Sequence, residues 1–398
     1  MSDLPLLPQG GGAGPAVPSP APVSPLPPVG VTRLTMTDFR SYAYARLETD
    51  LRPVVLTGPN GAGKTNLLEA VSFLAPGRGL RRARLHEVVR HGAAGGVQGA
   101  WAVAARLQTP GGEVAIGTGR EAGPSDRRIV HINGEPVRAQ AELGAVLSAI
   151  WLTPAMDRLF VEAASGRRRF FDRLVFGLYP DHAGRLSAYD SAWRQRNKLL
   201  KDGVRERAWY EGLEDAMAEH GIAVAAARRD VAARLSRALE QATGPFPSAD
   251  IGLDGFVERL LEDHTALEAE ETYRRLLTDH RPKEAAGAPG EGPHRTDLVV
   301  HHHGKSLPTA QCSTGEQKAV LIAILLAQAR VQALHRGMAP LLLLDEVAAH
   351  LDAQRRDALY DALCGLGAQA WLTGTDHALF ASFGARAQFF EVRDGGLH

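Results

Sequence analysis

The residues best suited to chemistry lie in one glycine-rich stretch, Gly58-Pro59-Asn60-Gly61-Ala62-Gly63-Lys64-Thr65-Asn66. It fits the spacing G-x-x-x-x-G-K-[ST], after a short apolar run and before an apolar-periodic segment, so an accidental match is the weaker interpretation. Its glycines allow positive φ, and its backbone N–H groups can surround phosphates. We expect Lys64 to reach the β- and γ-phosphates and the Thr65 hydroxyl to ligate Mg²⁺. The stretch predicts a nucleotide site, but the motif alone specifies no reaction.

A second set of polar residues follows four consecutive leucines, residues 341–344. Such a run predicts a buried parallel strand, and the acids Asp345 and Glu346 stand at its end. We expect Asp345 to hold Mg²⁺ through water and Glu346 to orient or activate an attacking water. Thr375-Asp376-His377 follows another predicted strand, at the position expected for a γ-phosphate sensor.

Ser313 and Glu316 have the S-x-x-E spacing of a capping box, at the start of a helix expected from about Glu316 to Leu334. A local cap would explain both residues. The same serine, with Gly315 and the helix N-terminus, also makes an anion site. The second interpretation is a loop that contacts a nucleotide phosphate held by another lobe.

Arginines are dense between Gly77 and Arg90, at positions 78, 81, 82 and 84. A solvated helix start is the usual meaning of such a run. Contact of Arg81, Arg82 and Arg84 with DNA phosphates is the alternative, and it predicts DNA binding that weakens steeply with salt. Arg40 is expected either near the nucleotide or in a solvated turn.

Composition limits the class of protein. The chain has 398 residues, 44% of them hydrophobic, and a formal net charge of zero, so we expect about two globular domains and only local basic surfaces. The two cysteines suggest small buried residues in a reducing compartment. We see no apolar run of membrane-spanning length and no secretory signal, and we therefore expect a cytoplasmic protein without a membrane partner.

The elements that must position these residues come from both ends of the chain. Residues 1–28, rich in Pro and Gly, are expected to be a disordered tail. Strands at 31–36, 39–42, 43–47, 101–107, 113–118 and 128–132, the last before an Asn133-Gly134 turn, place the N-terminal part of a head at 29–157. Helical periodicity at 166–241 and near 273–277 predicts a helical lobe at 158–281. A linker at 282–293 would lead to the C-terminal part of the head at 294–398.

The strand expected at Leu298–His303 carries three adjacent histidines. Neighbours on a strand point to opposite faces, and we expect no Cys or acidic partner for these histidines, so we favour a histidine-rich strand over a metal site. The predicted fold class is α/β, an ATP-binding-cassette type of P-loop head assembled from both chain ends, with an inserted, mainly helical lobe.

These motifs together resemble the RecF family, a branch of the ATP-binding-cassette superfamily related to the Rad50 and SMC heads. The resemblance covers nearly the whole chain after residue 29. Its segments are Asp38–Tyr42, Gly58–Glu69, Gly166–Asp172, Gln195–Leu200 and Gly292–Asp297. Cys312 and Thr314 depart from the pattern, since cassette proteins usually have leucine and glycine at these positions.

The resemblance implies an ATP- and Mg²⁺-dependent protein. Residues 58–66 would bind ATP in cis, and Ser313 and Gly315 would complete the site of a second molecule, giving a homodimer in the presence of ATP. It further implies a weak, DNA-dependent ATPase that binds double-stranded DNA and gapped DNA junctions and helps RecR and RecO load RecA.

Two other classes share the phosphate loop. The nucleotide-binding subunit of a transporter needs a surface for a membrane partner, which the arginine-rich helical insertion fits poorly. A small-molecule P-loop kinase has no use for the serine loop. Membrane co-fractionation or phosphoryl transfer to a metabolite would favour one or the other.

Overall fold

A computed structural model describes residues 29–93, 95–137, 141–393 and 395–397. The tail expected at residues 1–28 lies outside the described residues.

The central layer is a six-stranded sheet in the order β15-β14-β3-β13-β12-β8. Its strands are β3 (Val54–Thr57), β8 (Ala149–Leu152), β12 (Leu341–Leu344), β13 (Ala370–Gly374), β14 (Gln388–Arg393) and β15 (Gly396–Leu397). All neighbours are parallel except β14 and β15. Because β3 lies between β13 and β14, the head is assembled from both chain ends, as predicted.

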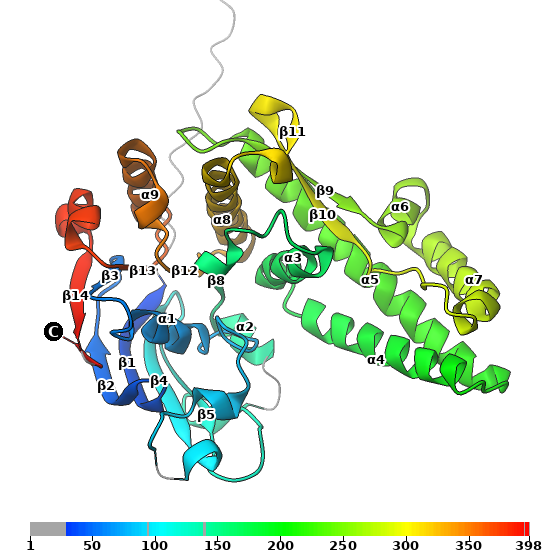
Figure 1. Cartoon of the computed structure of the whole chain (residues 1–398), viewed down its shortest axis with the longest axis horizontal. Helices are drawn as coiled ribbons and strands as arrows, with labels where there is room; N and C mark the ends of the chain where they lie inside the picture. The colour runs from blue at the N-terminus through cyan, green and yellow to red at the C-terminus, as the bar shows by residue number, and fades with distance from the viewer. Residues whose placement is uncertain (1–28, 94, 138–140, 394, 398) are drawn as a thin grey trace, which may run out of the picture.

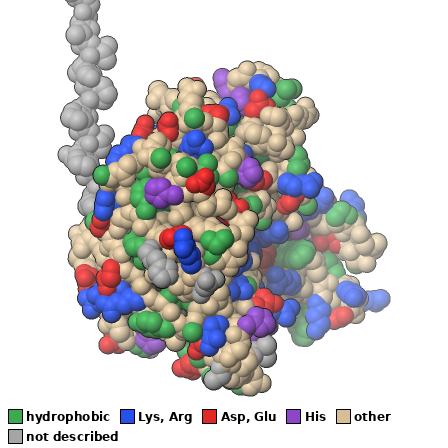
Figure 2. Space-filling model, turned by 60° about the vertical axis from the view of Figure 1, so that its left-hand side comes forward, with side chains coloured by type: hydrophobic (Ala, Val, Ile, Leu, Met, Phe, Trp, Pro, Cys, Tyr) green, Lys and Arg blue, Asp and Glu red, His purple; other side chains and the backbone are tan. Residues whose placement is uncertain are grey.

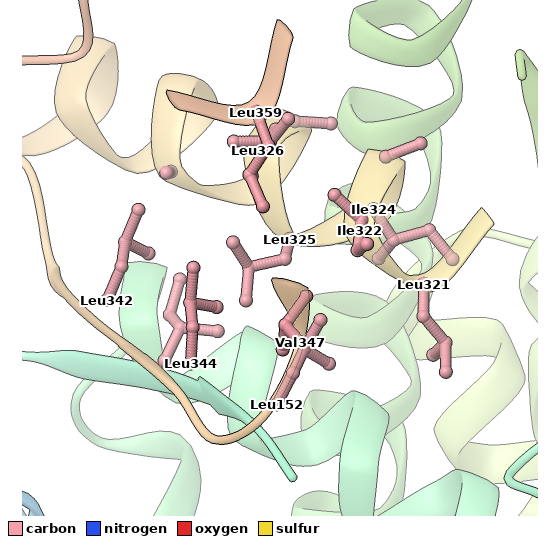
Figure 3. Packing of buried hydrophobic residues seen from close by; sticks show 14 of the residues in the cluster. Leu152, Leu321, Ile322, Ile324, Leu325, Leu326, Leu342, Leu344, Val347 and Leu359 are labelled. Carbon is pink, nitrogen blue, oxygen red and sulfur yellow. The ribbon is translucent and has the colours of Figure 1, made fainter. Parts of the chain in front are cut away.

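The leucines of β12 explain why this strand is central. Leu341 and Leu343 belong to the core on one face of the sheet, and Leu342 and Leu344 to the core on the other. A strand buried on both faces needs an unbroken apolar run. Figure 3 shows Leu342 and Leu344 pointing toward apolar side chains of the helix above.

A second sheet, of antiparallel strands, has the order β2-β1-β4-β5-β6-β7. Its strands are β1 (Gly30–Phe39), β2 (Tyr42–Glu48), β4 (Trp101–Thr109), β5 (Gly112–Arg120), β6 (Ile129–Ile132) and β7 (Glu135–Pro136). The Asn133-Gly134 hairpin turn is confirmed. The separate strand expected at 39–42 is wrong, because Arg40 and Ser41 form the turn between β1 and β2.

Helices cover both faces of the central sheet (Figure 1). On one side lie α8 (Thr314–Arg336) and α9 (Ala353–Gly365). On the other lies α1 (Lys64–Ser72), packed between the two sheets, and α2 (Ala141–Val146) lies nearby. Among the described residues, α8 alone is long and apolar enough to cross a membrane, but 78% of that stretch is buried inside the protein, as in a core helix.

The inserted part contains α3 (Ala164–Leu178), α4 (His182–Lys201), α5 (Arg207–Glu240), α6 (Phe256–Asp263) and α7 (Ala266–Ala285). The helical run expected at 166–241 is divided by turns at Pro180 and Gly203. α7 is much longer than the expected 273–277, and it includes the first four residues of the expected linker. Pro282 does not end it, although proline usually terminates a helix.

One strand of the lobe was not anticipated. β9 (Ala249–Asp254) pairs antiparallel with β10 (Asp297–His302), and β11 (Leu307–Pro308) completes a three-stranded sheet. Hydrogen bonding therefore crosses the expected boundary at residue 294. The division into a head and a helical lobe is therefore a proposal, in which this three-stranded sheet connects the two parts.

Candidate functional site

The phosphate loop connects β3 to α1 in a conformation that needs glycine. Gly58 has φ +144°, and a side chain there would meet the carbonyl oxygen of Val392 at 2.2 Å. Gly63 has φ +111°, and its side chain would meet the Tyr42 hydroxyl at 2.7 Å. Gly61, at φ +82°, has nothing within 4 Å of that position. The loop is thus fixed from behind by β2 and β14 and open at Gly61.

A cavity of about 200 Å³ lies over the loop, lined by Asn60, Gly61, Gly63, Lys64, Thr65, Asn66, Arg81 and Glu346. Gly58, Pro59 and Ala62 belong to the loop but do not line the cavity. The Lys64 ammonium donates to the carbonyl oxygens of Gly58 at 2.7 Å and Pro59 at 2.8 Å. Burial lowers the pKa of Lys64, and the carboxylates of Glu346 and Asp345 oppose that shift.

The acidic pair reaches this loop from the other end of the chain. The Asp345 carboxylate is buried and accepts hydrogen bonds from the Thr65 hydroxyl at 2.9 and 3.1 Å. Glu346 has φ +54°, a strained conformation for this residue type. Its N–H donates to the Thr373 hydroxyl at 2.9 Å, and that hydroxyl donates to Asp345 at 2.7 Å. The structure therefore places Lys64, Thr65, Asp345 and Glu346 in one site.

Thr373 was missed by the sequence analysis, which placed a phosphate sensor at residues 375–377. Asp376 instead caps the following turn, accepting from the Ala378 N–H at 2.8 Å, and the His377 ring lies against Phe389. Thr373 precedes the terminal glycine of β13. Its position as a polar residue in an otherwise apolar predicted strand could have indicated a role in the site.

Arg81 lines the cavity over the phosphate loop, whereas the two interpretations of its charge run were a solvated helix start and contact with DNA phosphates. Its guanidinium donates to Asn66 Oδ1 at 2.7 Å and to Glu69 Oε2 at 3.0 Å. Glu69 is fully buried on α1 and also accepts two hydrogen bonds from Arg40, at 2.8 and 2.7 Å. Arg40 does not line the cavity, but it shares the Glu69 carboxylate with Arg81. The role of Glu69 was not predicted. An acidic residue on the apolar side of a helix such as α1 could have indicated a buried ion pair.

The other two arginines of the expected DNA-binding run point elsewhere. Arg82 is exposed, with φ +56°, and its side chain forms no hydrogen bond or ion pair with any described residue. Arg84 lines a separate cavity of about 590 Å³ with Arg78 and Arg127. The run is thus divided among the nucleotide cavity, an exposed surface and a second, basic cavity.

The serine loop lies at the N-terminus of α8. The Glu316 carboxylate accepts from the Ser313 N–H at 3.0 Å and pairs with Lys305. Lys305 and then Ser313 lower the pKa of Glu316 to about 2. The local cap is therefore present. Ser313 and Gly315 are exposed, and neither lines the cavity over the chain's own phosphate loop.

The residues around the cavity fit a polyphosphate with a divalent cation. Lys64, Arg81 and the loop N–H groups supply donors and positive charge, and Thr65 and Asp345 supply the oxygen ligands that Mg²⁺ prefers. The cavity of about 200 Å³ is below the roughly 300–1,000 Å³ of most small-molecule sites. It suits the phosphates, so the rest of a nucleotide must lie against a more open surface.

Comparisons with known proteins agree with this geometry. Residues 30–395 match the model of the RecF/RecN/SMC N terminal domain. The chain is 51% identical over 371 residues to "DNA replication and repair protein RecF" of Rhizobium etli, covering 92% of this chain and 98% of that protein. The protein of the same name from Mesorhizobium japonicum is 49% identical, with 92% and 96% covered.

Solved structures show the same fold. The recombination mediator protein RecF-ATPrS in the RecFOR pathway has a TM-score of 0.79 at 21% identity, covering 93% of this chain and 98% of that one. An Smc head domain from Pyrococcus furiosus has a TM-score of 0.50 at 16% identity, covering 93% of this chain and 95% of that one. At these identities the likeness concerns the fold alone.

Proposed function

The chain belongs to the RecF family of DNA replication and repair proteins, and from this premise we propose that it is an ATP-dependent DNA-binding clamp of recombinational repair. The observation that carries the proposal is the hydrogen bond between Thr65 and Asp345, which joins the two halves of an ATP-binding-cassette site across 280 residues. A transporter subunit or a metabolite kinase has no comparable support.

Each residue of the site has a role in this mechanism. Loop N–H groups, Lys64 and Arg81 bind and orient the phosphates, and Thr65 and Asp345 would hold Mg²⁺. Mg²⁺·ATP supplies the phosphoryl group to be transferred. Glu346 lines the cavity and orients the attacking water, while Thr373 holds the backbone of Glu346 and the carboxylate of Asp345. Hydrolysis is slow, and it serves as a switch stimulated by DNA.

A homodimer completes the site. Ser313 and Gly315 are exposed at the N-terminus of α8, where backbone N–H groups favour an anion. Because they do not line the chain's own cavity, they are available to the nucleotide of a second molecule. ATP held between two molecules closes the dimer, and its hydrolysis opens it. The differential affinity of the closed and open states for DNA carries the function.

The partners follow from the family. We propose that the closed dimer binds double-stranded DNA and gapped junctions and acts in the cytoplasm with RecR and RecO to load RecA. The solved RecF protein with the same fold is described as a recombination mediator of the RecFOR pathway, which supports this assignment.

The test is the solution mass of Glu346→Gln by light scattering, with and without ATP and a gapped duplex. Removing the carboxylate while keeping its shape slows hydrolysis, so we expect an ATP-dependent dimer that DNA strengthens. Glu121→Gln, at an exposed position after β5, serves as the matched control and behaves like the natural chain. A Glu346→Gln chain that stays monomeric at saturating ATP contradicts the clamp.

A further inference from the structure

The first turns of α3 carry an unusual excess of positive charge. Arg167, Arg168 and Arg169 follow its start, and the first turn contains no acidic residue. Cations are unfavourable there, because the N-terminal end of the helix dipole is itself positive. The arginines therefore lower the stability of this helix end, and a bound anion would offset that effect.

Only one of these arginines is neutralised by a carboxylate of the described residues. Arg167 donates to both oxygens of Asp297, at 2.7 Å each. Arg168 donates to the carbonyl oxygen of Thr296 at 2.9 Å. Arg169 is exposed and has no hydrogen bond or ion pair within the part of the chain that the structure describes. Among the described residues, the guanidinium groups of Arg168 and Arg169 thus form no direct ion pair, although Asp297 and Asp172 act on Arg168 through space.

The other nearby carboxylate is already occupied. Asp172 accepts from Arg228 at 2.8 and 2.9 Å and contacts the His182 ring at 3.0 Å. Arg228 also donates to the carbonyl oxygen of Pro293 at 2.7 Å, so this pair joins α3 and α5 to the segment before β10. Asp172 therefore forms its hydrogen bonds with Arg228 and the His182 ring, and it acts on Arg168 only through space.

The head adds charge of the same sign across the junction. The head segment before Arg78 lies against α3, because Pro76 and Gly77 line one cavity with Arg173 and Phe176. Partial desolvation lowers the pKa of Arg82, and the positive charges of Arg169 and Arg78 lower it further. The side chain of Arg78, like that of Arg82, forms no hydrogen bond or ion pair with any described residue. Figure 2 shows Lys and Arg side chains gathered in the recess where the head meets the helical lobe.

We propose that these four residues, Arg78 and Arg82 of the head and Arg168 and Arg169 of α3, form a phosphate-binding seam for the DNA backbone. The inference rests on the proposed function and specifies where the DNA runs: its backbone crosses from the head loop onto the helical lobe. Guanidinium groups bind phosphate oxygens in a bidentate manner. A phosphate bound between two arginines also offsets the electrostatic repulsion between their positive charges. A surface confined to the head would leave the exposed charge of Arg169 without a role.

The experiment measures the affinity of the full chain, with ATP, for a fluorescent gapped duplex over a series of salt concentrations. The variants are Arg82→Ala, Arg169→Ala and the double variant. Arg168 is left in place because it hydrogen-bonds the Thr296 carbonyl. Arg237→Ala, at an exposed position near the end of α5, removes the same charge far from the seam and is the control.

The slope of log affinity against log salt should become shallower by about one for each phosphate that a variant no longer binds. We expect that change in Arg82→Ala and in Arg169→Ala, about twice that change in the double variant, and none in Arg237→Ala. Thermal unfolding midpoints equal to that of the natural chain confirm that all variants fold.

A natural slope in Arg169→Ala beside a reduced slope in Arg82→Ala overturns the inference and confines DNA to the head, while the proposed function stands. Natural slopes in both single variants overturn it as well. A natural chain that binds no duplex, with or without ATP, overturns the proposed function itself.

Discussion

The Lys64 ammonium has hydrogen-bond donors both for the phosphate loop and for a ligand. Its ammonium has three hydrogens, and two of them donate to the carbonyl oxygens of Gly58 and Pro59. These bonds hold the side chain along the loop and leave one donor, with the full charge, for a phosphate. Lys64 therefore shapes the loop as well as binding the ligand.

Replacing Lys64 with alanine removes a charge-assisted hydrogen bond to phosphate. Such bonds contribute about 1.5–3 kcal/mol, so we expect ATP affinity to fall roughly 10- to 100-fold. Binding of a fluorescent ATP analogue measures it, with Lys201→Ala at the exposed end of α4 as the control. Unchanged affinity in Lys64→Ala would remove the residue from phosphate binding.

Arg81 and Arg82 show how adjacent residues of one type acquire different surroundings. Arg82 adopts a left-handed φ of +56°, which redirects the chain at this point. Arg81 then contacts Asn66 and Glu69 at the cavity over the phosphate loop, while the Arg82 side chain is exposed. Two adjacent arginines of one charge run therefore belong to different surfaces.

At the scale of elements, α8 combines a role in the core with the binding role that we propose for its N-terminus. All of its residues from Gln317 to Ala329 are buried, and Figure 3 shows Leu325 and Leu326 in that packing. Its first residues remain exposed, because Ser313 precedes the point where the helix enters the core. A helix so firmly packed would hold Ser313 and Gly315 in place for the second molecule of the proposed dimer.

Placing an arginine at Ser313 should obstruct the contact between two molecules without disturbing ATP binding in cis. We expect Ser313→Arg to bind ATP normally and to remain monomeric by light scattering in the Glu346→Gln background. Loss of a helix cap costs about 1 kcal/mol in itself. Thr265→Arg, at the capping box of α7, loses an equivalent cap away from the site and should still dimerise. Dimerisation of Ser313→Arg would exclude this serine from the interface.

At the scale of the whole molecule, the two chain ends are joined by a buried amide. Gln369 accepts from the Val31 N–H at 2.8 Å and donates to the carbonyl oxygens of Val31 at 2.9 Å and Asp50 at 2.7 Å. It also accepts from the Trp371 ring nitrogen at 3.0 Å. One side chain thus fastens β1 to β13 across 338 residues of sequence.

Gln369→Ala should lower the free energy of unfolding by about 3–5 kcal/mol, because several buried polar groups lose their partners at once. Urea unfolding measures the change. Gln388→Ala is a matched control, since Gln388 bonds the same Asp50 backbone in an exposed setting and should cost about 1 kcal/mol or less. Equal losses in the two variants would contradict the role of Gln369.

Local patterns carried much of the sequence-based prediction. The phosphate loop, the buried strand at 341–344 and the cap at Ser313 each follow from residues close together in the chain, whose chemistry constrains neighbouring backbone directly. The long helical run was predicted, but its turns at Pro180 and Gly203 were not. β9 was missed, because its stability comes from pairing with β10 across more than forty residues.

By itself, the sequence determined the residue types of the site: a glycine loop, an ammonium, a hydroxyl and two carboxylates. Only the tertiary structure decided which of them meet. The contact of Thr65 with Asp345, the part played by Thr373, and the separation of Arg81 from Arg82 depend on strand order and on one backbone angle. Parallel strands from opposite chain ends become neighbours because apolar side chains far apart in sequence are buried together. The hydrophobic periodicity of each strand does not indicate which strand it pairs with.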